Sequence, residues 1–314
     1  MEAVIPFVGQ VSAEDEKNWI DALSGALPNE QIIPFADLSE SQRTSSTIAI
    51  VANPSPEDLA KLPNLVWIQS VWAGVERLLG ELRDRPFEIV RMVDPEMSRT
   101  MAEAVLSWTL YLHRDMPAYA KQQRERKWVE LPYTKPSQKT VGILGLGKLG
   151  KVAGRKLAEA GFNVMGWSRR PEDIQNINTK SGDDGLKQVI SQSDIIVLLL
   201  PLSDTTRGLL NKNVFDQMRI GTSLINFSRG PIIDDDDLIE ALDTGRIDHA
   251  VLDVFHQEPL PQDNPFWGHE RVTVLPHISA PTDFDTATKI VSKNISRYRK
   301  IGILPMTVDK ERGY

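Results

Sequence analysis

Short apolar runs alternate with amphipathic stretches along most of the chain. In the first part of the chain, apolar runs predict short strands at residues 3–8, 31–34, 48–52, 66–70 and 87–90. The stretch 14–27, between the first two runs, has the apolar spacing of a helix. Strands separated by helical stretches are typical of an α/β unit, so a small α/β domain is predicted at the N-terminus.

A long helical pattern and a break follow this first series. The helical spacing runs from about residue 99 to residue 127, and the segment 113–115 and Pro117 interrupt it. Pro132 and Pro136, among polar residues, then mark a break. A linker region is expected there.

After the break, unbroken apolar runs recur in the way that a buried parallel sheet requires. Strands are predicted at residues 140–144, 163–167, 195–200, 223–226, 250–254 and 272–275. Helices are predicted at residues 148–160, 185–191 and 235–243. This order predicts a doubly wound parallel sheet. A last helical segment, 285–300, has no strands of its own, so we expect it to return to the first domain.

Composition narrows the classes of function. The 314 residues are 41% apolar and 25% charged, which excludes a disordered or fibrous protein. A net charge of −7 offers no bulk attraction for nucleic acid or anionic membranes. The longest apolar run, 195–200, is far shorter than the stretch of about 20 residues that spans a membrane. The chain has no cysteine, so disulfides and thiolate metal sites are excluded. We expect no nucleic-acid or membrane partner and a cytoplasmic location.

A glycine-rich loop connects the predicted strand 140–144 to the helix that follows it. Gly145, Gly147 and Gly150 have the G-x-G-x-x-G spacing of a dinucleotide-binding fold. In such a loop, Gly145 makes the tight turn, Gly147 lets the backbone approach a pyrophosphate, and Gly150 allows close packing of the helix on the strand. The phosphates would meet the helix N-terminus, whose N–H groups favour anions.

The end of the next predicted strand indicates which dinucleotide binds. An NAD-binding fold usually has an acidic residue there to hold the ribose 2′-hydroxyl, but this chain has Ser168, Arg169 and Arg170. A hydroxyl and two guanidinium groups suit a phosphate monoester, so NADP(H) is predicted over NAD(H). In the alternative interpretation, the two arginines belong to a solvated loop, with Glu172 and Asp173 as partners.

Three further segments place a charged residue just beyond a predicted strand, where ligands bind in open α/β sheets. Arg229 lies in the segment 226–230, Glu258 in 253–259 and His277 in 275–279. Each residue alone is more often a surface charge or a structural histidine. Their occurrence in this order within one dinucleotide fold makes them candidate catalytic residues.

These motifs together resemble those of the D-isomer-specific 2-hydroxyacid dehydrogenase family, and within it the bacterial glyoxylate/hydroxypyruvate reductases. The resemblance covers essentially the whole chain. The segments that carry it are WAGV at 72–75, the glycine loop, SRG around Arg229, DVF at 253–255, EPLP at 258–261, Pro276-His277 and the C-terminal segment 308–314, which ends in RGY.

The resemblance implies two domains with the active site in the cleft between them. Residues 1–98 and 282–314 would form a smaller, flavodoxin-like α/β substrate domain. Residues 99–281 would form a Rossmann-type dinucleotide-binding domain.

The resemblance also implies a role for each candidate residue. His277 would protonate the carbonyl oxygen of a 2-oxo acid, and Glu258 would orient the imidazole and favour its protonated form. Arg229 would bridge the carboxylate and the carbonyl of the substrate. The amides of Ala73 and Gly74 would hold the carboxylate, and Trp72 would line the pocket. Further cofactor contacts are implied at Leu149, Leu200, Pro201, Phe227, Ser228, Arg229, Asp253 and His277.

Other polar clusters are interpreted as structural. The four aspartates at 234–237 are expected to cap a helix and to occupy its first turn, rather than to bind a metal. His113, His249, His256 and His269 have no mutual metal-ligand spacing and are expected to be structural or exposed. No metal site is predicted.

The sequence therefore predicts an NADPH-dependent reductase that converts glyoxylate to glycolate and hydroxypyruvate to glycerate. A broader reductase of bulkier 2-oxo acids, or a nicotinamide-sensing binding protein without catalysis, are the alternatives. The resemblance further implies a homodimer formed through the helical segment 99–127, with intradomain packing of that segment as the other interpretation. Trp128 would then reach the substrate pocket of the partner subunit.

Overall fold

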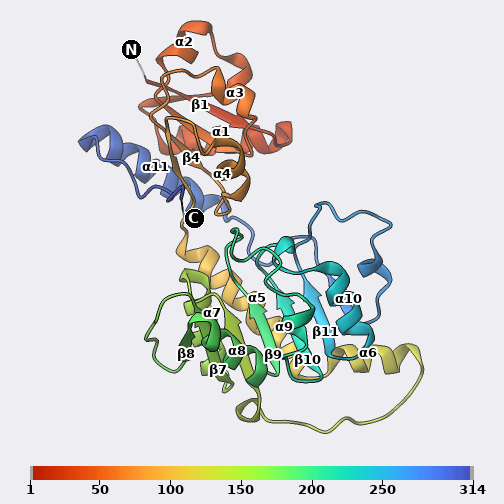
Figure 1. Ribbon diagram of the computed structural model, residues 1–314. Helices are drawn as coiled ribbons and strands as arrows, with labels where there is room; N and C mark the ends of the chain where they lie inside the picture. The colour runs from red at the N-terminus through yellow and green to blue at the C-terminus, as the bar shows by residue number, and fades with distance from the viewer. Residues whose placement is uncertain (1–2, 312–314) are drawn as a thin grey trace. The chain divides into compact units, whose positions relative to one another are not determined.

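The structure, a computed structural model, describes residues 3–311 and divides into two compact units (Figure 1). Unit 1 comprises Met1–Glu96 and Thr282–Tyr314, and unit 2 comprises Met97–Pro281. The expected boundaries, after residues 98 and 281, lie within two residues of this division. The last three residues of the RGY-ending segment lie outside the described part of the chain.

The described part of unit 1 contains a parallel sheet of five strands in the order β2-β1-β3-β4-β5. The strands are β1 (Ala3–Gly9), β2 (Glu30–Pro34), β3 (Ile48–Ala52), β4 (Trp67–Ser70) and β5 (Glu88–Val90). Each coincides with a predicted strand to within one or two residues. This order is the flavodoxin-like one, so the expected fold of this domain is confirmed.

Helices cover both faces of this sheet. They are α1 (Ala13–Ala26), α2 (Glu40–Ser45), α3 (Pro56–Ala60), α4 (Glu76–Leu82) and α11 (Phe284–Ile301). Trp19 and Leu23 of α1 share one hydrophobic cluster with Val291 and Ile295 of α11. The C-terminal helix therefore packs in unit 1, as expected, because its apolar face completes the N-terminal core.

The described part of unit 2 contains a parallel sheet of seven strands in the order β12-β11-β10-β9-β6-β7-β8. The strands are β6 (Thr140–Leu144), β7 (Asn163–Ser168), β8 (Asn178–Ser181), β9 (Ile195–Leu198), β10 (Thr222–Asn226), β11 (Ile247–Leu252) and β12 (Val272–Val274). The chain runs outward from β6 in both directions, which is the Rossmann-type order. The predicted doubly wound sheet is thus confirmed, with β8 as an additional edge strand.

Two hydrophobic clusters cover the two faces of this second sheet. One cluster contains residues of α5 (Pro95–His113) and α7 (Lys148–Glu159). The other contains residues of α8 (Gly182–Gln192), α9 (Lys212–Phe215) and α10 (Asp235–Asp243). Short 3₁₀ helices form at Phe35–Asp37, Pro136–Gln138, Gly230–Ile232 and Pro265–Gly268. Among residues 3–311, none of the helices has both the length and the hydropathy of a membrane span.

The helical segment 99–127 is divided in two at the expected interruption, residues 113–115 and Pro117. The structure has α5, which ends at His113, and a separate α6 (Met116–Arg124). Asp115 adopts a left-handed backbone conformation with φ of 54°, which no helix continues through, and Pro117 occupies the first turn of α6. The apolar face expected to dimerise also packs inside unit 2, since Met101, Val105 and Leu112 lie in its core.

Candidate active site

The glycine loop joins β6 to α7 in unit 2. Gly145 has a φ of 111°, and a Cβ atom there would lie 2.6 Å from the carbonyl oxygen of Leu199. A Cβ atom at Gly150 would overlap the carbonyl oxygen of Gly145. These two positions therefore form the tight turn and the close helix–strand contact that the motif requires.

The remaining glycine of the loop, Gly147, is exposed and not packed against other atoms. Gly147 is the N-cap of α7, and no heavy atom lies within 4 Å of its Cβ position. The N-terminus of this twelve-residue helix is thus open to an anion, and the loop fits the pyrophosphate of a dinucleotide. Leu149, in the first turn, is half-buried.

The residues expected to determine the preference for NADP over NAD lie at the end of β7 and directly after it. Ser168 ends the strand, and its hydroxyl donates a hydrogen bond of 2.6 Å to the carbonyl oxygen of Arg170. Arg169 and Arg170 are exposed. The carboxylate of Glu172, an alternative partner for them, forms an ion pair of 2.8 Å with Lys151 of α7.

The loops after β9 and β10 are joined by a side chain. The hydroxyl of Ser228 accepts a hydrogen bond of 2.9 Å from the amide of Leu200. Asn226, the last residue of β10, accepts from the amide of Ser228 and donates to the carbonyl oxygen of Arg229. Arg229 itself donates to the carbonyl oxygen of Ser228 at 2.6 Å. Among the expected cofactor contacts, the side chains of Leu200 and Phe227 are buried in the two cores of the unit, and Pro201 is half-buried.

Asp253, directly after β11, holds the segment that carries His277. Its two carboxylate oxygens accept hydrogen bonds from the amides of Ile278, at 2.7 Å, and Ser279, at 2.9 Å. His277 has a left-handed backbone conformation with φ of 55°. The carboxylate therefore stabilises an uncommon backbone conformation at the candidate catalytic histidine, a task that sequence reasoning did not assign to it.

His277 and Glu258 form a hydrogen-bonded pair. The imidazole Nδ1 lies 2.7 Å from Oε2 of Glu258. Oε1 of the same carboxylate accepts a hydrogen bond of 2.9 Å from the amide of Phe255. Since a carboxylate can only accept, Nδ1 carries the proton, and Nε2 of His277 is the atom left for chemistry. The imidazole is half-exposed, so a ligand can reach it.

The pair changes the acidity of both groups. The hydrogen bond that His277 donates to Glu258 raises the pKa of His277, and this outweighs the effect of burial, which lowers it. Burial alone would raise the pKa of Glu258, but the hydrogen bonds from His277 and from the Phe255 amide lower it overall. His277 is therefore an acid whose protonated form persists to higher pH than that of an ordinary histidine.

The expected carboxylate loop lies in unit 1, directly after β4. The Ser70 hydroxyl accepts a hydrogen bond from the amide of Trp72 and donates one to the carbonyl oxygen of Trp72. This carbonyl oxygen also accepts a hydrogen bond from the amide of Met92. Within residues 3–311, the amides of Ala73 and Gly74 have no hydrogen-bond acceptor. The Trp72 ring packs edge-on against Trp19, with 6.3 Å between the ring centroids. Two N–H groups of this loop thus remain for an anion.

The other clusters behave as the sequence predicted. Asp234 is the N-cap of α10 and accepts a hydrogen bond from the amide of Asp237, which confirms the capping role. His113 and His249 are buried. His269 contacts Asp243 at 3.3 Å. These residues have structural roles or surface contacts.

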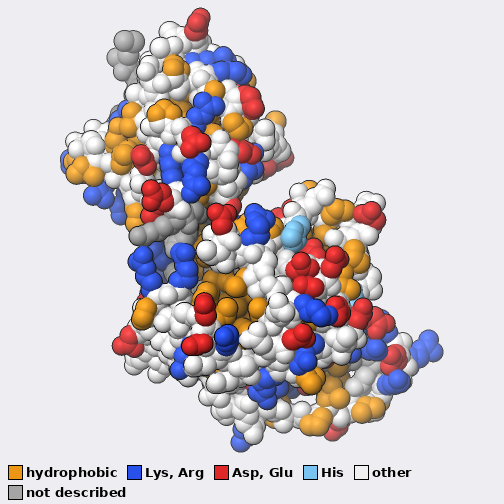
Figure 2. All heavy atoms as spheres, in the orientation of Figure 1, with side chains coloured by type: hydrophobic (Ala, Val, Ile, Leu, Met, Phe, Trp, Pro, Cys, Tyr) orange, Lys and Arg blue, Asp and Glu red, His pale blue; other side chains and the backbone are white. Residues whose placement is uncertain are grey.

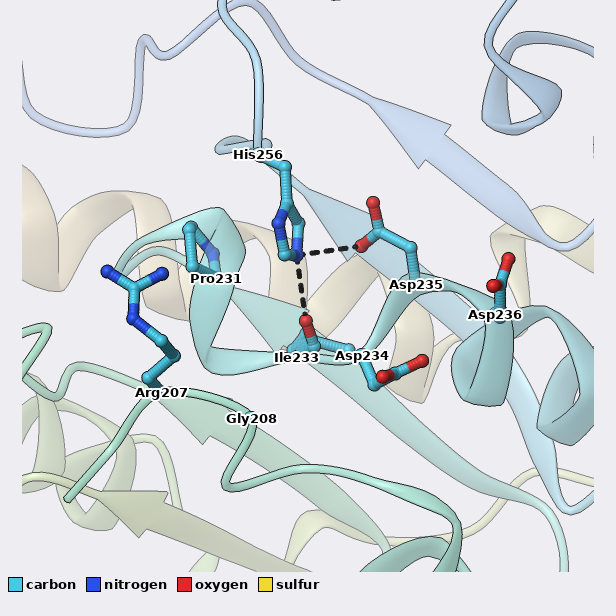
Figure 3. Close-up of a pocket in the computed structure, with 8 residues that line it drawn as sticks. All are labelled: Arg207, Gly208, Pro231, Ile233, Asp234, Asp235, Asp236 and His256. Atoms are coloured by element: carbon cyan, nitrogen blue, oxygen red, sulfur yellow. Dashed lines mark hydrogen bonds and ion pairs between the residues drawn. The ribbon is translucent and has the colours of Figure 1, made fainter. Parts of the chain in front are cut away.

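Sequence reasoning set His256 aside as structural or exposed, but the structure places it beside a pocket near the Glu258 loop (Figure 3). The pocket has a volume of about 390 Å³ and is lined by Arg207, Gly208, Pro231, Ile233, Asp234, Asp235, Asp236 and His256. The signal that could have found this residue is its position two residues before Glu258.

Comparisons with known proteins show the family to which this chain belongs. The family model described as D-isomer specific 2-hydroxyacid dehydrogenase, NAD binding domain, matches residues 106–279. Glyoxylate/hydroxypyruvate reductase A of Photorhabdus laumondii subsp. laumondii is 36% identical over 307 residues, which cover 96% of this chain and 97% of that protein. The protein of the same name from Yersinia enterocolitica is 35% identical, with the same coverage.

Solved structures match the whole chain. A D-isomer specific 2-hydroxyacid dehydrogenase from Xanthobacter autotrophicus Py2, in complex with NADPH and MES, has a TM-score of 0.92, 33% identity and full coverage of both chains. An NADPH-dependent glyoxylate/hydroxypyruvate reductase from Sinorhizobium meliloti, in complex with NADP and sulfate, has a TM-score of 0.91 and 32% identity, and the match covers 99% of this chain and 100% of that one. This chain therefore belongs to the D-isomer specific 2-hydroxyacid dehydrogenase family, and unit 2 contains its NAD-binding domain.

Proposed function

We propose that this chain is an NADPH-dependent reductase of small 2-oxo acids, which converts glyoxylate to glycolate and hydroxypyruvate to glycerate. The observation that carries the proposal is the contact of 2.7 Å between His277 and Glu258 beyond the ends of β11 and β12. An imidazole whose pKa is raised by a carboxylate is suited to protonate a carbonyl oxygen during reduction. The names of the two curated relatives support the substrate assignment.

The cofactor assignment rests on two features of unit 2. The open helix N-terminus at Gly147 receives the pyrophosphate. The exposed residues Arg169 and Arg170 receive the 2′-phosphate of NADP(H), which NAD(H) lacks. The similar structures that contain NADPH or NADP support this preference, and NAD(H) serves as the less efficient cofactor.

Each unit offers groups that suit the substrate, main chain in unit 1 and a side chain in unit 2. The amides of Ala73 and Gly74, which lack acceptors in the described part of the chain, hold the substrate carboxylate. Arg229, with its planar fork of donors, bridges the carboxylate and the carbonyl oxygen. Trp72 adjoins these amides and contributes apolar surface to the pocket.

The chemistry follows from these positions. Bound NADPH supplies the hydride that reduces the carbonyl carbon. His277 donates the proton on Nε2 to the carbonyl oxygen as negative charge develops there, while Glu258 keeps the ring oriented through Nδ1. Arg229 stabilises the same developing charge electrostatically.

A parallel screen tests the proposal. Oxidation of NADPH and of NADH is followed spectrophotometrically with glyoxylate, hydroxypyruvate and a series of bulkier 2-oxo acids. We expect the highest kcat/KM with the two small acids and NADPH. Higher efficiency with the bulkier acids would instead establish a broader 2-oxo acid reductase, and no turnover with any acid would contradict the proposal.

The cofactor preference has its own test. Replacing Arg169 by Ala removes a charge-assisted contact with the 2′-phosphate, worth roughly 1.5–3 kcal/mol, so the preference should fall about tenfold to a hundredfold, mainly through the KM for NADPH. Arg155→Ala, at an exposed position of α7, is the control and should leave the preference unchanged. Equal efficiency of the unmodified protein with both cofactors would contradict the assignment.

We also propose that two copies of this chain form a homodimer through α6 and the segment after it. Trp128 is 96% exposed, and Val129, Tyr133 and Met116 are also exposed. Figure 2 shows hydrophobic side chains among the charged ones on the surface. A second copy would cover this apolar surface, and Trp128 would line its substrate pocket.

Light scattering coupled to size-exclusion chromatography tests this assembly. We expect a dimer, and a Trp128→Ala variant that remains dimeric with altered preference between glyoxylate and hydroxypyruvate. Val66→Ala, at an exposed apolar position of unit 1, is the matched control. A fully active monomer would contradict the proposal.

A further inference from the structure

The segments that carry Arg229 and Glu258 pack directly against each other. Gly230, next to Arg229, lies against the backbone of Phe255 and His256, and a Cβ atom at Gly230 would overlap backbone atoms of both residues. Glycine is therefore required at this contact. The two candidate catalytic segments share one interface inside unit 2.

A histidine joins the same two segments a few residues further on. Nε2 of His256 lies 3.0 Å from the carbonyl oxygen of Ile233 and 3.6 Å from Oδ1 of Asp235 (Figure 3). Because a carbonyl oxygen can only accept, Nε2 carries the proton and donates it. Figure 3 shows the imidazole directed at the start of α10, where Ile233 and Asp235 meet it.

His256 is connected to the catalytic pair through a short turn. The carboxylate of Glu258, two residues later, accepts from the amide of Phe255, so residues 255–258 close on themselves. The other oxygen of this carboxylate bonds to His277. A displacement of His256 would therefore move the carboxylate that orients His277.

We propose that His256, held by Ile233 and Asp235, is a positioning residue that fixes the Glu258 turn onto the Arg229 segment and so keeps Glu258 aligned with His277. The inference rests on the proposed function, because it assigns His256 to the reaction that His277 performs there. His256 does not touch the reacting atoms in this proposal, and it acts through Glu258 alone.

The exposure of His256 distinguishes this role from core packing. The His256 side chain is 48% exposed, so its contacts with Ile233 and Asp235, rather than burial of its ring, are its main contribution. Burial raises the pKa of Asp235, its neighbours Asp234 and Asp236 raise it further, and the charge of His256 opposes this rise. Arg207, which is positively charged, also lines the pocket.

The experiment compares three substitutions with a matched control. His256→Ala removes both contacts, His256→Gln retains an N–H donor for the Ile233 carbonyl, and Asp235→Asn keeps the shape but removes the charge. His269→Gln is the control, because His269 forms a similar contact of 3.3 Å with Asp243 but, within residues 3–311, no hydrogen bond with either catalytic segment. Melting temperatures establish that each variant is folded.

The primary readout is the pKa of His277, measured by NMR titration of the histidine ring signals. The chain has five histidines, so the signals can be assigned by substitution. We expect the pKa of His277 to fall in His256→Ala and Asp235→Asn, to stay near the parent value in His256→Gln, and to be unchanged in His269→Gln. This readout does not depend on the identity of the substrate.

The second readout is steady-state reduction of glyoxylate. We expect kcat to fall about tenfold in His256→Ala, while the KM for NADPH stays the same, because a misplacement of about 1 Å can cost about a hundredfold in rate and a smaller one costs less. The inference would be overturned if both His256→Ala and Asp235→Asn kept the His277 pKa and the kcat of the unmodified protein. It would also be overturned if these variants lost stability while the pKa of His277 stayed unchanged. Absence of turnover in the unmodified protein would overturn the proposed function instead, and the NMR result would still decide the role of His256.

Discussion

Two histidines at neighbouring strands of unit 2 behave in contrasting ways: His249 lies within β11, and His277 follows β12. Inside the strands, Nε2 of His249 lies 2.9 Å from the hydroxyl of Thr273. Beyond the strand ends, Nδ1 of His277 lies 2.7 Å from Glu258. Burial, with the charges of Arg271 and His269, lowers the pKa of His249 to about 4, whereas Glu258 raises that of His277.

The difference shows how position in a parallel sheet decides what a histidine does. His249 is buried against a hydroxyl group, which neither compensates a positive charge nor provides access for a ligand. His277 is half-exposed and bonded to a carboxylate, beyond the carboxyl ends of the strands, where ligands bind in this type of sheet. One histidine is therefore a neutral structural group and the other an acid.

The largest expected effect comes from replacing His277, the half-exposed histidine of the two. His277→Ala eliminates the proton donor, and such donors contribute about a hundredfold to ten-thousandfold, so kcat for glyoxylate should fall by that amount. NADPH binding, measured by fluorescence titration, should remain within about twofold of the parent, because proton donation matters only as charge develops on the substrate. Retention of more than about a tenth of the parent kcat would show that another group donates the proton.

A smaller effect is expected when the carboxylate partner is changed. Glu258→Gln keeps an acceptor for Nδ1 but removes the charge that raises the pKa of His277. We expect kcat to fall about tenfold, and the alkaline limb of the profile of kcat/KM against pH to move to lower pH, because the imidazolium then loses its proton earlier. A profile that coincides with the parent profile would contradict the role of Glu258.

A third prediction tests the support that the carboxylate of Asp253 gives to the backbone at His277. Asp253→Asn retains one carbonyl oxygen, so one of the two bonds to the amides of Ile278 and Ser279 is lost. We expect a loss of stability of about 1 kcal/mol, measured by urea unfolding, and a decrease in kcat of about threefold to tenfold. Unchanged stability together with unchanged kcat would show that these bonds do not hold His277 in place.

The smallest effect on catalysis is expected at the buried histidine. His249→Gln should leave kcat/KM and its dependence on pH within about twofold of the parent values, which makes it the control for His277→Ala. In the parent, the folded state binds the His249 proton only near pH 4 while the unfolded state binds it near 6.5, so this residue makes stability fall as the pH drops through that window. The melting temperature of the variant should therefore change less between pH 6.5 and 4 than that of the parent. An equal change in both proteins would contradict the neutral state of the imidazole.

Much of the fold was readable from the sequence because the information is local. The strands of unit 1 are runs of apolar residues that are buried in place, such as Ile48–Ala52, which is buried along its whole length. The glycine loop was also recognisable, since its spacing reflects a turn and a close backbone contact that no other residue tolerates at Gly145 and Gly150. Recognising the family required only the order of such segments.

Other features could not be read from local patterns. The strand β8 is polar and lies at the edge of its sheet, so it has no apolar run to mark it. The interruption of the helical pattern 99–127 was visible at residues 113–115 and Pro117, but the left-handed conformation of Asp115, which divides the segment into two helices, was not. Its apolar residues were also assigned to an interface between subunits, whereas the sheet of unit 2 buries several of them.

The sequence by itself determined the fold class and nominated Arg229, Glu258 and His277, because each lies next to a strand end and each has a side chain suited to its task. The family resemblance also implied that Glu258 orients His277, and the structure contains this hydrogen bond. Only the tertiary structure decided that Asp253 holds the backbone of His277 and that His256 reaches Ile233 and Asp235. The physical reason is the distance along the sequence over which each kind of interaction acts. Strand and turn preferences act over a few residues, but the hydrogen bonds between strand ends join residues 19 to 25 positions apart, and these contacts exist only after the sheet has brought the ends together.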